Sequence, residues 1–178
     1  MTLRNTPSSF GSVARAFHWG MALLVVVAIV LIELTDLAPK GSALRRGMRE
    51  WHSQAGLLVL ALVWFRLAWK LVNTEPAIVP PPAAWQRKAA HAVAWTFYAL
   101  MVVLPVLGIL MLQADGRPVA LLGLPLPVVV GVDKALAHRL EDVHEWLGNA
   151  MLVLIGLHVA ATVWHGVVLR DNTLARMR

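Results

Sequence analysis

The sequence contains no cysteine among its 178 residues. Disulfide bonds, thiolate zinc sites, iron–sulfur clusters and the CxxCH type of haem attachment are therefore excluded. Charged residues are also scarce, at 15% of the chain, whereas hydrophobic residues make up 58%. This composition is not that of a soluble domain, and the length is sufficient for one domain that spans residues 1–178.

Four apolar stretches are long enough to cross a bilayer as helices, which need about 20 residues each. They cover roughly residues 14–35, 51–72, 89–113 and 139–169. The first stretch has a basic start like a signal peptide, but it is too long for such an apolar core and lacks a small-x-small cleavage site. We therefore expect it to be retained. The fold class predicted is an all-α, four-helix transmembrane bundle.

The net charge of +6 could suggest a nucleic-acid partner. However, the basic residues lie in short loops beside the apolar runs, where membrane orientation explains them better, and we expect no nucleic acid to bind. With four spans both termini lie on one side of the membrane. That side carries nine Lys and Arg against seven on the other, which predicts cytoplasmic termini (N-in/C-in).

Histidine is the polar residue type that recurs in the apolar runs. Six of the seven histidines lie in or at the ends of predicted spans, where ionisable groups usually serve a function. The segment HEWLGNAMLVLIGLH begins at His144 and ends at His158. Fourteen residues turn a helix by about 1400°, roughly 40° short of four turns, so both imidazoles share a face about 21 Å apart. This separation is too large for one metal ion and suits two stacked cofactors.

Depth in the membrane then suggests the second ligand of each site. His52 matches His144 near the outer side, and His18 matches His158 near the inner side. Two bis-histidine sites in a four-helix bundle are typical of a membrane dihaem cytochrome b. His165 is an alternative to His158, but it would set the sites about 31 Å apart, the whole hydrocarbon thickness. His165 and His91 are otherwise candidates for a quinone pocket, or interfacial residues that face lipid headgroups.

Other residues in the spans agree with bound haem. Gly56 and Gly148 each follow a candidate ligand by four residues, where a missing side chain leaves room for a porphyrin. Helix packing explains membrane glycines equally well. Arg66 lies fourteen residues after His52, at the level of the inner site, where haem propionates would neutralise it. The alternative is an arginine that reaches out to the headgroups.

Taken in order, the motifs RAFHW, WHSQAGLL…WFRL, FYALMVVLPVLG, HEWLGNAMLVLIGLH and RDNTLARM resemble the bacterial dihaem cytochrome b561 family, which is related to cytochrome b subunits of hydrogenases and formate dehydrogenases. The resemblance covers nearly the whole chain. It implies two haem b groups in a multi-pass protein of the bacterial inner membrane. In that family the ligands come from spans 1, 2 and 4, which implies His18, His52, His144 and His158 and favours His158 over His165.

The resemblance further implies a superoxide oxidase, which takes electrons from periplasmic superoxide and passes them through haem to membrane ubiquinone. Basic residues that precede His52 and His144 would steer the anion to the outer haem; they are Arg45, Arg46, Arg49, Lys134 and Arg139. They could equally be solvated loop charges or partners of the propionates. Interleaved acidic residues weaken the steering argument.

Two other functions remain open at this point. The chain could be a cytochrome b anchor that passes electrons between quinone and a partner dehydrogenase or hydrogenase, which requires a separate protein redox partner. It could also be a haem-free, histidine-lined transporter of metal ions or protons, although no clear internal repeat is present. Haem content separates the transporter from both cytochrome interpretations.

Overall fold

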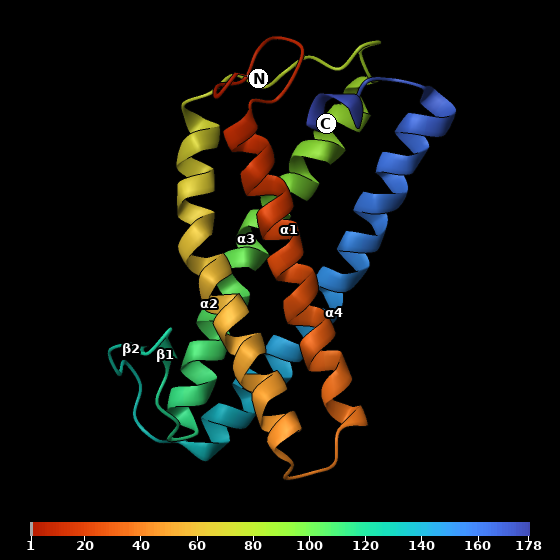
Figure 1. Ribbon diagram of the computed structural model, residues 1–178. Coiled ribbons are helices and arrows are strands. Elements are labelled where there is room, and N and C mark those ends of the chain that lie inside the picture. The colour runs from red at the N-terminus through yellow and green to blue at the C-terminus, as the bar shows by residue number, and fades with distance from the viewer. Residues whose placement is uncertain (1) are drawn as a thin grey trace.

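Four long helices form an up-and-down bundle in the computed structural model, which describes residues 2–178 (Figure 1). They are α1 (Ser12–Glu33), α2 (Ala43–Leu71), α3 (Ala84–Ala114) and α4 (Lys134–Trp164). Each helix is long and apolar enough to cross a membrane. Helix α1 packs along α2, α2 along α3 and α3 along α4. The predicted four-helix transmembrane bundle is confirmed.

The two ends of the bundle differ, and we name them by what they carry. The terminal end carries both chain termini and residues 72–83, and the hairpin end carries residues 34–42 and 115–133 (Figure 1). At the terminal end the three segments are joined by main-chain hydrogen bonds, from Phe10 N to Arg176 O (3.0 Å) and from Ala77 N to Pro7 O (2.9 Å). A short 3-10 turn, η3 (Ala175–Met177), ends the chain there.

Three helices begin several residues before the apolar stretches do, because polar side chains cap them. Ser42 Oγ accepts from Arg45 N at the start of α2 (3.1 Å), and Asp133 Oδ1 accepts from Leu136 N at the start of α4 (2.9 Å). At the start of α3, Gln86 Oε1 accepts from Ala83 N (2.9 Å). These bonds satisfy backbone groups that the first helical turn leaves free.

The last predicted span is not one uniform helix. Helix α4 ends at Trp164 and continues as a π-helical turn, η2 (His165–Leu169). Arg170 then adopts a left-handed conformation with φ of 50°, which turns the chain back toward the bundle. The change of helical type falls on the residues after Trp164, which a straight helix to residue 169 did not predict.

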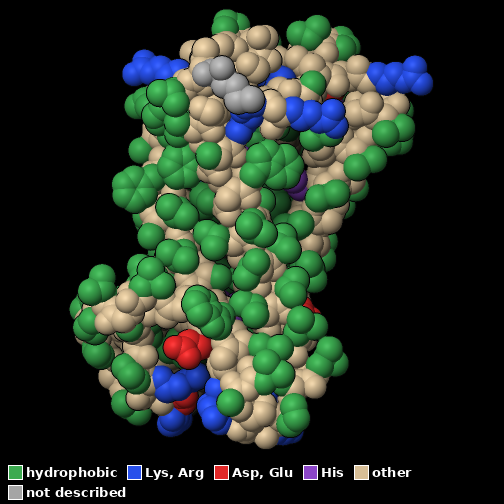
Figure 2. Space-filling view, in the orientation of Figure 1, with side chains coloured by type: hydrophobic (Ala, Val, Ile, Leu, Met, Phe, Trp, Pro, Cys, Tyr) green, Lys and Arg blue, Asp and Glu red, His purple; other side chains and the backbone are tan. Residues whose placement is uncertain are grey.

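Apolar side chains cover the outside of the bundle. Figure 2 shows them over the middle of the visible face, with Lys and Arg gathered toward the two ends. Leu23 and Phe65 are each 65% exposed, and only a small core around Met21 and Val63 is fully buried. Soluble monomers rarely expose so much contiguous apolar surface, and in a bilayer it faces the lipid chains.

The loop at residues 115–133 is fastened to the bundle by two glutamines. A short hairpin, β1 (Ala120–Leu121) and β2 (Leu124–Pro125), lies beside α2. Gln54 Nε2 donates to Ala120 O (2.8 Å), and its Oε1 accepts from Leu122 N (2.9 Å). Gln113 holds residues 127 and 129 in the same two-sided way, at 2.8 and 3.0 Å. A 3-10 turn, η1 (Leu34–Leu37), connects α1 toward α2 at this end.

Replacement of the buried Gln113 should destabilise the protein more than replacement of the partly exposed Gln54. Gln113 is 4% exposed, so Gln113→Ala removes two hydrogen bonds and opens a cavity, at a cost of about 1–3 kcal/mol. Gln54→Ala is the matched control with the smaller expected loss, since water can replace its partly exposed bonds. Thermal unfolding in detergent measures both. An unchanged unfolding temperature for Gln113→Ala would contradict this account of the loop.

Candidate functional site

The helices bring the four histidines together in the predicted pairs. His52 of α2 and His144 of α4 face each other at the hairpin end, with ring centroids 6.1 Å apart. His18 of α1 and His158 of α4 face each other nearer the terminal end, at 6.4 Å. Helix α4 therefore contributes one imidazole to each pair. After the predicted orientation, we call His52 and His144 the outer pair and His18 and His158 the inner pair.

The spacing within each pair suits one metal atom between two imidazoles. A metal–imidazole bond is about 2 Å, so two rings bound to one metal have centroids roughly 6 Å apart. Across residues 2–178 there is no group of three or more His, Cys, Asp or Glu placed to hold a metal ion. Each pair therefore offers two imidazole ligands to one metal atom and leaves the other coordination positions free for a macrocycle. The donor set fits bis-histidine haem.

The ring environment of the outer pair also fits metal ligation. His52 Nδ1 lies 2.8 Å from the carbonyl oxygen of Ala28 on α1. Donation from Nδ1 to this carbonyl leaves Nε2 with a free lone pair, as in most metal-ligating histidines. His144 Nδ1 is buried, and no group among residues 2–178 forms a hydrogen bond with it. The missing side chain of Gly108 on α3 makes room for this ring, because a Cβ there would lie 3.6 Å from His144 Cε1.

The two glycines next to the outer pair lie beside open space. A Cβ added to Gly56 or Gly148 would meet no atom within 4 Å, although both residues are partly buried. Close packing between helices would bring a neighbouring atom within that distance, so packing does not explain these glycines. The open space leaves room for a flat macrocycle beside His52 and His144, although most glycines of the described chain also face open space.

Arg66 lies at the inner pair and not at the headgroups. Its Nη2 is 3.3 Å from His18 Nδ1, and its Cζ is 5.6 Å from the centroid of the Tyr98 ring. A guanidinium can only donate hydrogen bonds, so His18 Nδ1 accepts in this arrangement. Ligation of a metal through Nε2 requires hydrogen on Nδ1, so Arg66 must then turn to another acceptor, for which a haem carboxylate is suited.

His165 belongs to neither pair and is held by a carboxylate that the sequence motifs did not single out. Its Nδ1 is 2.5 Å from Asp171 Oδ2, and the two side chains are 18% and 3% exposed. Burial alone raises the pKa of Asp171, but hydrogen bonds from Thr173 and His165 outweigh it and leave that pKa below its usual range. His91, the other quinone candidate, is exposed on α3. Of the two quinone candidates, His165 is therefore the one whose ring is fixed by a buried partner.

Three of the five basic residues predicted to steer an anion are bonded to loop residues at the hairpin end. Arg45 Nη2 pairs with Asp36 (2.8 Å), Arg46 Nη1 donates to Gly41 O (2.5 Å), and Lys134 Nζ pairs with Asp115 (2.6 Å). The bond from Lys134 is the main reason that the pKa of Asp115 lies below its usual range. These contacts stabilise the hairpin end, and the two carboxylates offset the charges of Arg45 and Lys134.

Arg49 instead lines a cavity of about 300 Å³ at the hairpin end. The residues around it are Arg49, Met111, Asp115, Arg117, Lys134, Ala137, His138 and Glu141. Arg49 precedes His52 by three residues, and Glu141 precedes His144 by three. Residues three apart lie on the same side of a helix, so the cavity is about one turn beyond the outer pair. Arg139 is exposed outside the lining, and Arg117 is a lining residue that sequence analysis missed.

Comparison with known proteins agrees with this geometry. A family model described as prokaryotic cytochrome b561 matches residues 9–178. The chain is 36% identical over 160 residues to "Cytochrome b561 homolog 1" of Escherichia coli K12, covering 90% of this chain and 91% of the relative. It is also 36% identical over 160 residues to "Probable superoxide oxidase CybB" of Yersinia pestis, with 90% of each chain covered. "Cytochrome b561 homolog 2" of E. coli is 27% identical over 179 residues, 99% of this chain and 95% of that protein.

The His165–Asp171 contact predicts a pH-dependent stability. Because the pKa of Asp171 is depressed in the folded protein, its stabilising effect is present at neutral pH and is lost as the pH falls below about 4. Asp171→Asn should lower the free energy of unfolding at pH 7 by about 1–3 kcal/mol, and the difference should shrink in acid. Unfolding temperatures across pH test this. Asp36→Asn, at an 85% exposed carboxylate, is the control and should change little.

Proposed function

Because the chain belongs to the prokaryotic cytochrome b561 family of membrane electron-transfer proteins, which bind haem b, generally two per chain, we propose that it oxidises superoxide and reduces ubiquinone. In this proposal superoxide reacts at the hairpin end and ubiquinone at the terminal end. The observation that carries it is the pair of facing imidazoles at each of two depths along α4.

The four histidines act as ligands in this proposal. His52 and His144 hold the outer haem b, and His18 and His158 hold the inner one. Haem b supplies reversible one-electron transfer when it is bound. Since the ligands lie on three different helices, each site is positioned by the packing of the bundle.

Each ubiquinone needs two superoxide ions, because superoxide donates one electron and ubiquinone accepts two. Two superoxide ions lose one electron each and become two molecules of O₂, and ubiquinone takes up two electrons and two protons to become ubiquinol. The name of the Yersinia pestis relative supports superoxide as the donor. Arg49 lines the cavity one turn beyond His52, where a guanidinium raises the local concentration of a small anion.

The proton requirement of ubiquinone suits the terminal end. His165 is a base that is held by the ionised Asp171, so its ring can carry a proton toward a quinone oxygen while the carboxylate stabilises the charge. With termini on the cytoplasmic side, as the distribution of Lys and Arg predicts, protons come from the cytoplasm and superoxide from the periplasm.

Removal of one ligand should cost one haem. We expect His52→Ala and His158→Ala each to retain about half of the haem b, and each to lose a different one of two low-spin signals in electron paramagnetic resonance. His138→Ala, at a histidine outside both pairs, is the control and should keep both. Loss of the same signal in both variants would show that the pairing across the bundle is wrong.

Arg49 should matter for the reaction with superoxide but not for haem binding. Arg49→Gln should lower the second-order rate constant with superoxide roughly threefold to tenfold and weaken its dependence on ionic strength. The matched control is Arg139→Gln, which removes an exposed charge outside the cavity and should have a smaller effect. The assay follows reduction of a ubiquinone analogue by the purified chain. Inactivity of the haem-loaded wild type without a second protein would favour the anchor-subunit function instead.

A further inference from the structure

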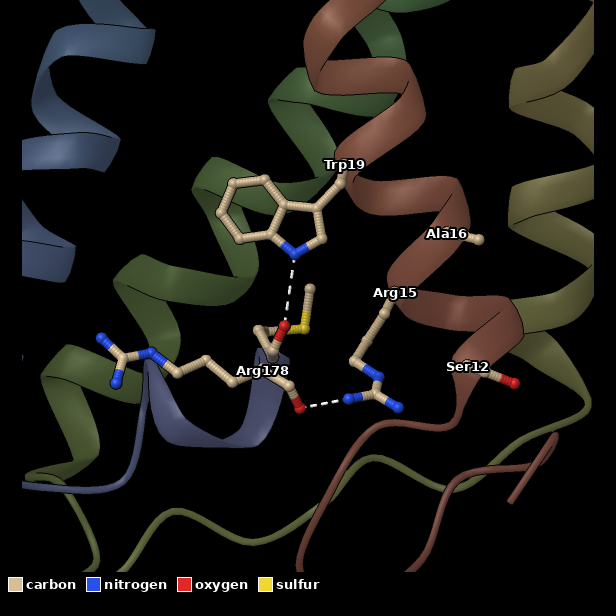
Figure 3. Close-up of a pocket in the computed structure, with 6 residues that line it drawn as sticks. Ser12, Arg15, Ala16, Trp19 and Arg178 are labelled. Atoms are coloured by element: carbon tan, nitrogen blue, oxygen red, sulfur yellow. Dashed lines mark hydrogen bonds between the residues drawn. The ribbon is translucent and has the colours of Figure 1, made fainter. Parts of the chain in front are cut away.

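A second cavity, of about 380 Å³, lies at the terminal end beside the start of α1. Its lining residues are Ser12, Arg15, Ala16, Trp19, Met177 and Arg178 (Figure 3). None of the paired histidines and no acidic side chain is among them. The cavity is therefore distinct from both histidine pairs, although the centroid of the Trp19 ring lies 5.1 Å from that of the His18 ring, and its lining side chains carry two positive charges and no negative one.

The walls of the cavity are held together by two hydrogen bonds. Arg15 Nη1 donates to the main-chain oxygen of Arg178, and Trp19 Nε1 donates to Met177 O at 3.2 Å. Figure 3 shows both side chains directed from α1 toward the C-terminal turn. A guanidinium has five N–H groups, so Arg15 keeps donors for a further partner. Helix α1 has no acidic residue in its first turn and no side-chain cap, so its positive end adds to the field.

The helix face that forms the cavity continues into the membrane as an apolar strip. At 100° per residue, Ser12, Ala16 and Trp19 share a face with Leu23, Val26 and Val30. These three apolar side chains are 65%, 47% and 47% exposed. Met21, almost on the opposite side of α1, is 1% exposed and lies in the core. A basic cavity thus stands above a strip that faces lipid chains.

We propose that this cavity binds the phosphodiester headgroup of an anionic phospholipid, of which phosphatidylglycerol is the test case. The guanidinium of Arg15 supplies charge-assisted donors to the phosphate oxygens, and Arg178 adds a second positive charge to the lining. Trp19, 53% exposed, takes the position of an interfacial aromatic residue. The acyl chains lie along Leu23, Val26 and Val30. This strip favours a membrane lipid over free phosphate, which has no apolar part to place there.

The test counts phosphatidylglycerol bound to the haem-loaded protein, by native mass spectrometry from nanodiscs that contain phosphatidylcholine and phosphatidylglycerol. We expect wild type to retain phosphatidylglycerol in preference to phosphatidylcholine. Ala16→Glu puts a carboxylate at the exposed rim and should weaken retention roughly tenfold, whereas Ala16→Gln, of the same size, should not. Added inorganic phosphate should not displace the lipid.

A second pair of variants decides the matter if Ala16→Glu fails to fold. Arg15→Gln keeps a donor for the Arg178 carbonyl and should lose most of the preference, whereas Arg87→Gln removes an exposed charge elsewhere at the terminal end and should keep it. Equal retention by Arg15→Gln and Arg87→Gln would overturn the proposal. Displacement by millimolar inorganic phosphate would also overturn it, since the cavity would then be a site for free phosphate.

Discussion

At each of two depths, two imidazoles face each other across the bundle. The rest of the structure depends on this constraint. An imidazole inside a bilayer needs a partner, and here each one meets another helix at a ring separation of 6.1 or 6.4 Å. Helices α1 and α2 form one packed pair, and α3 and α4 form another. The histidines of α4 face α1 and α2, so a metal atom bound between the rings of a pair would cross-link the two halves of the bundle.

The two ends of the bundle have different chemistry, which supports the direction that we propose for electron transfer. The hairpin end carries most of the acidic residues, and its Arg45 and Lys134 are tied to carboxylates. Arg49 remains at a cavity close to the outer pair. The terminal end carries His165 with its buried carboxylate. A small anion therefore fits the first end, and a reaction that consumes protons fits the second.

Helical periodicity made the histidine pairs predictable. The fourteen-residue interval from His144 to His158 puts both imidazoles on one face of a straight helix, and matching by depth then assigns His52 and His18. The family resemblance favoured His158 over His165. Contacts between loops were not predictable in this way. The pairing of Asp171 with His165 depends on the π-helical turn after Trp164 and the left-handed Arg170. The ion pairs of Arg45 and Lys134 depend on how residues 34–42 and 115–133 fold back. The helical periodicity of the sequence does not encode this folding.

The central claim is that one chain holds two haem groups between four histidines. The most direct measurement is the number of haem b per polypeptide in purified protein, with the spin state of each read from its absorption and electron paramagnetic resonance spectra. The account predicts two haem b per chain, both six-coordinate and low-spin, since every iron has two imidazoles. One haem per chain, or a high-spin haem in intact protein, would contradict the paired-ligand arrangement, and absence of haem would contradict the electron-transfer function itself.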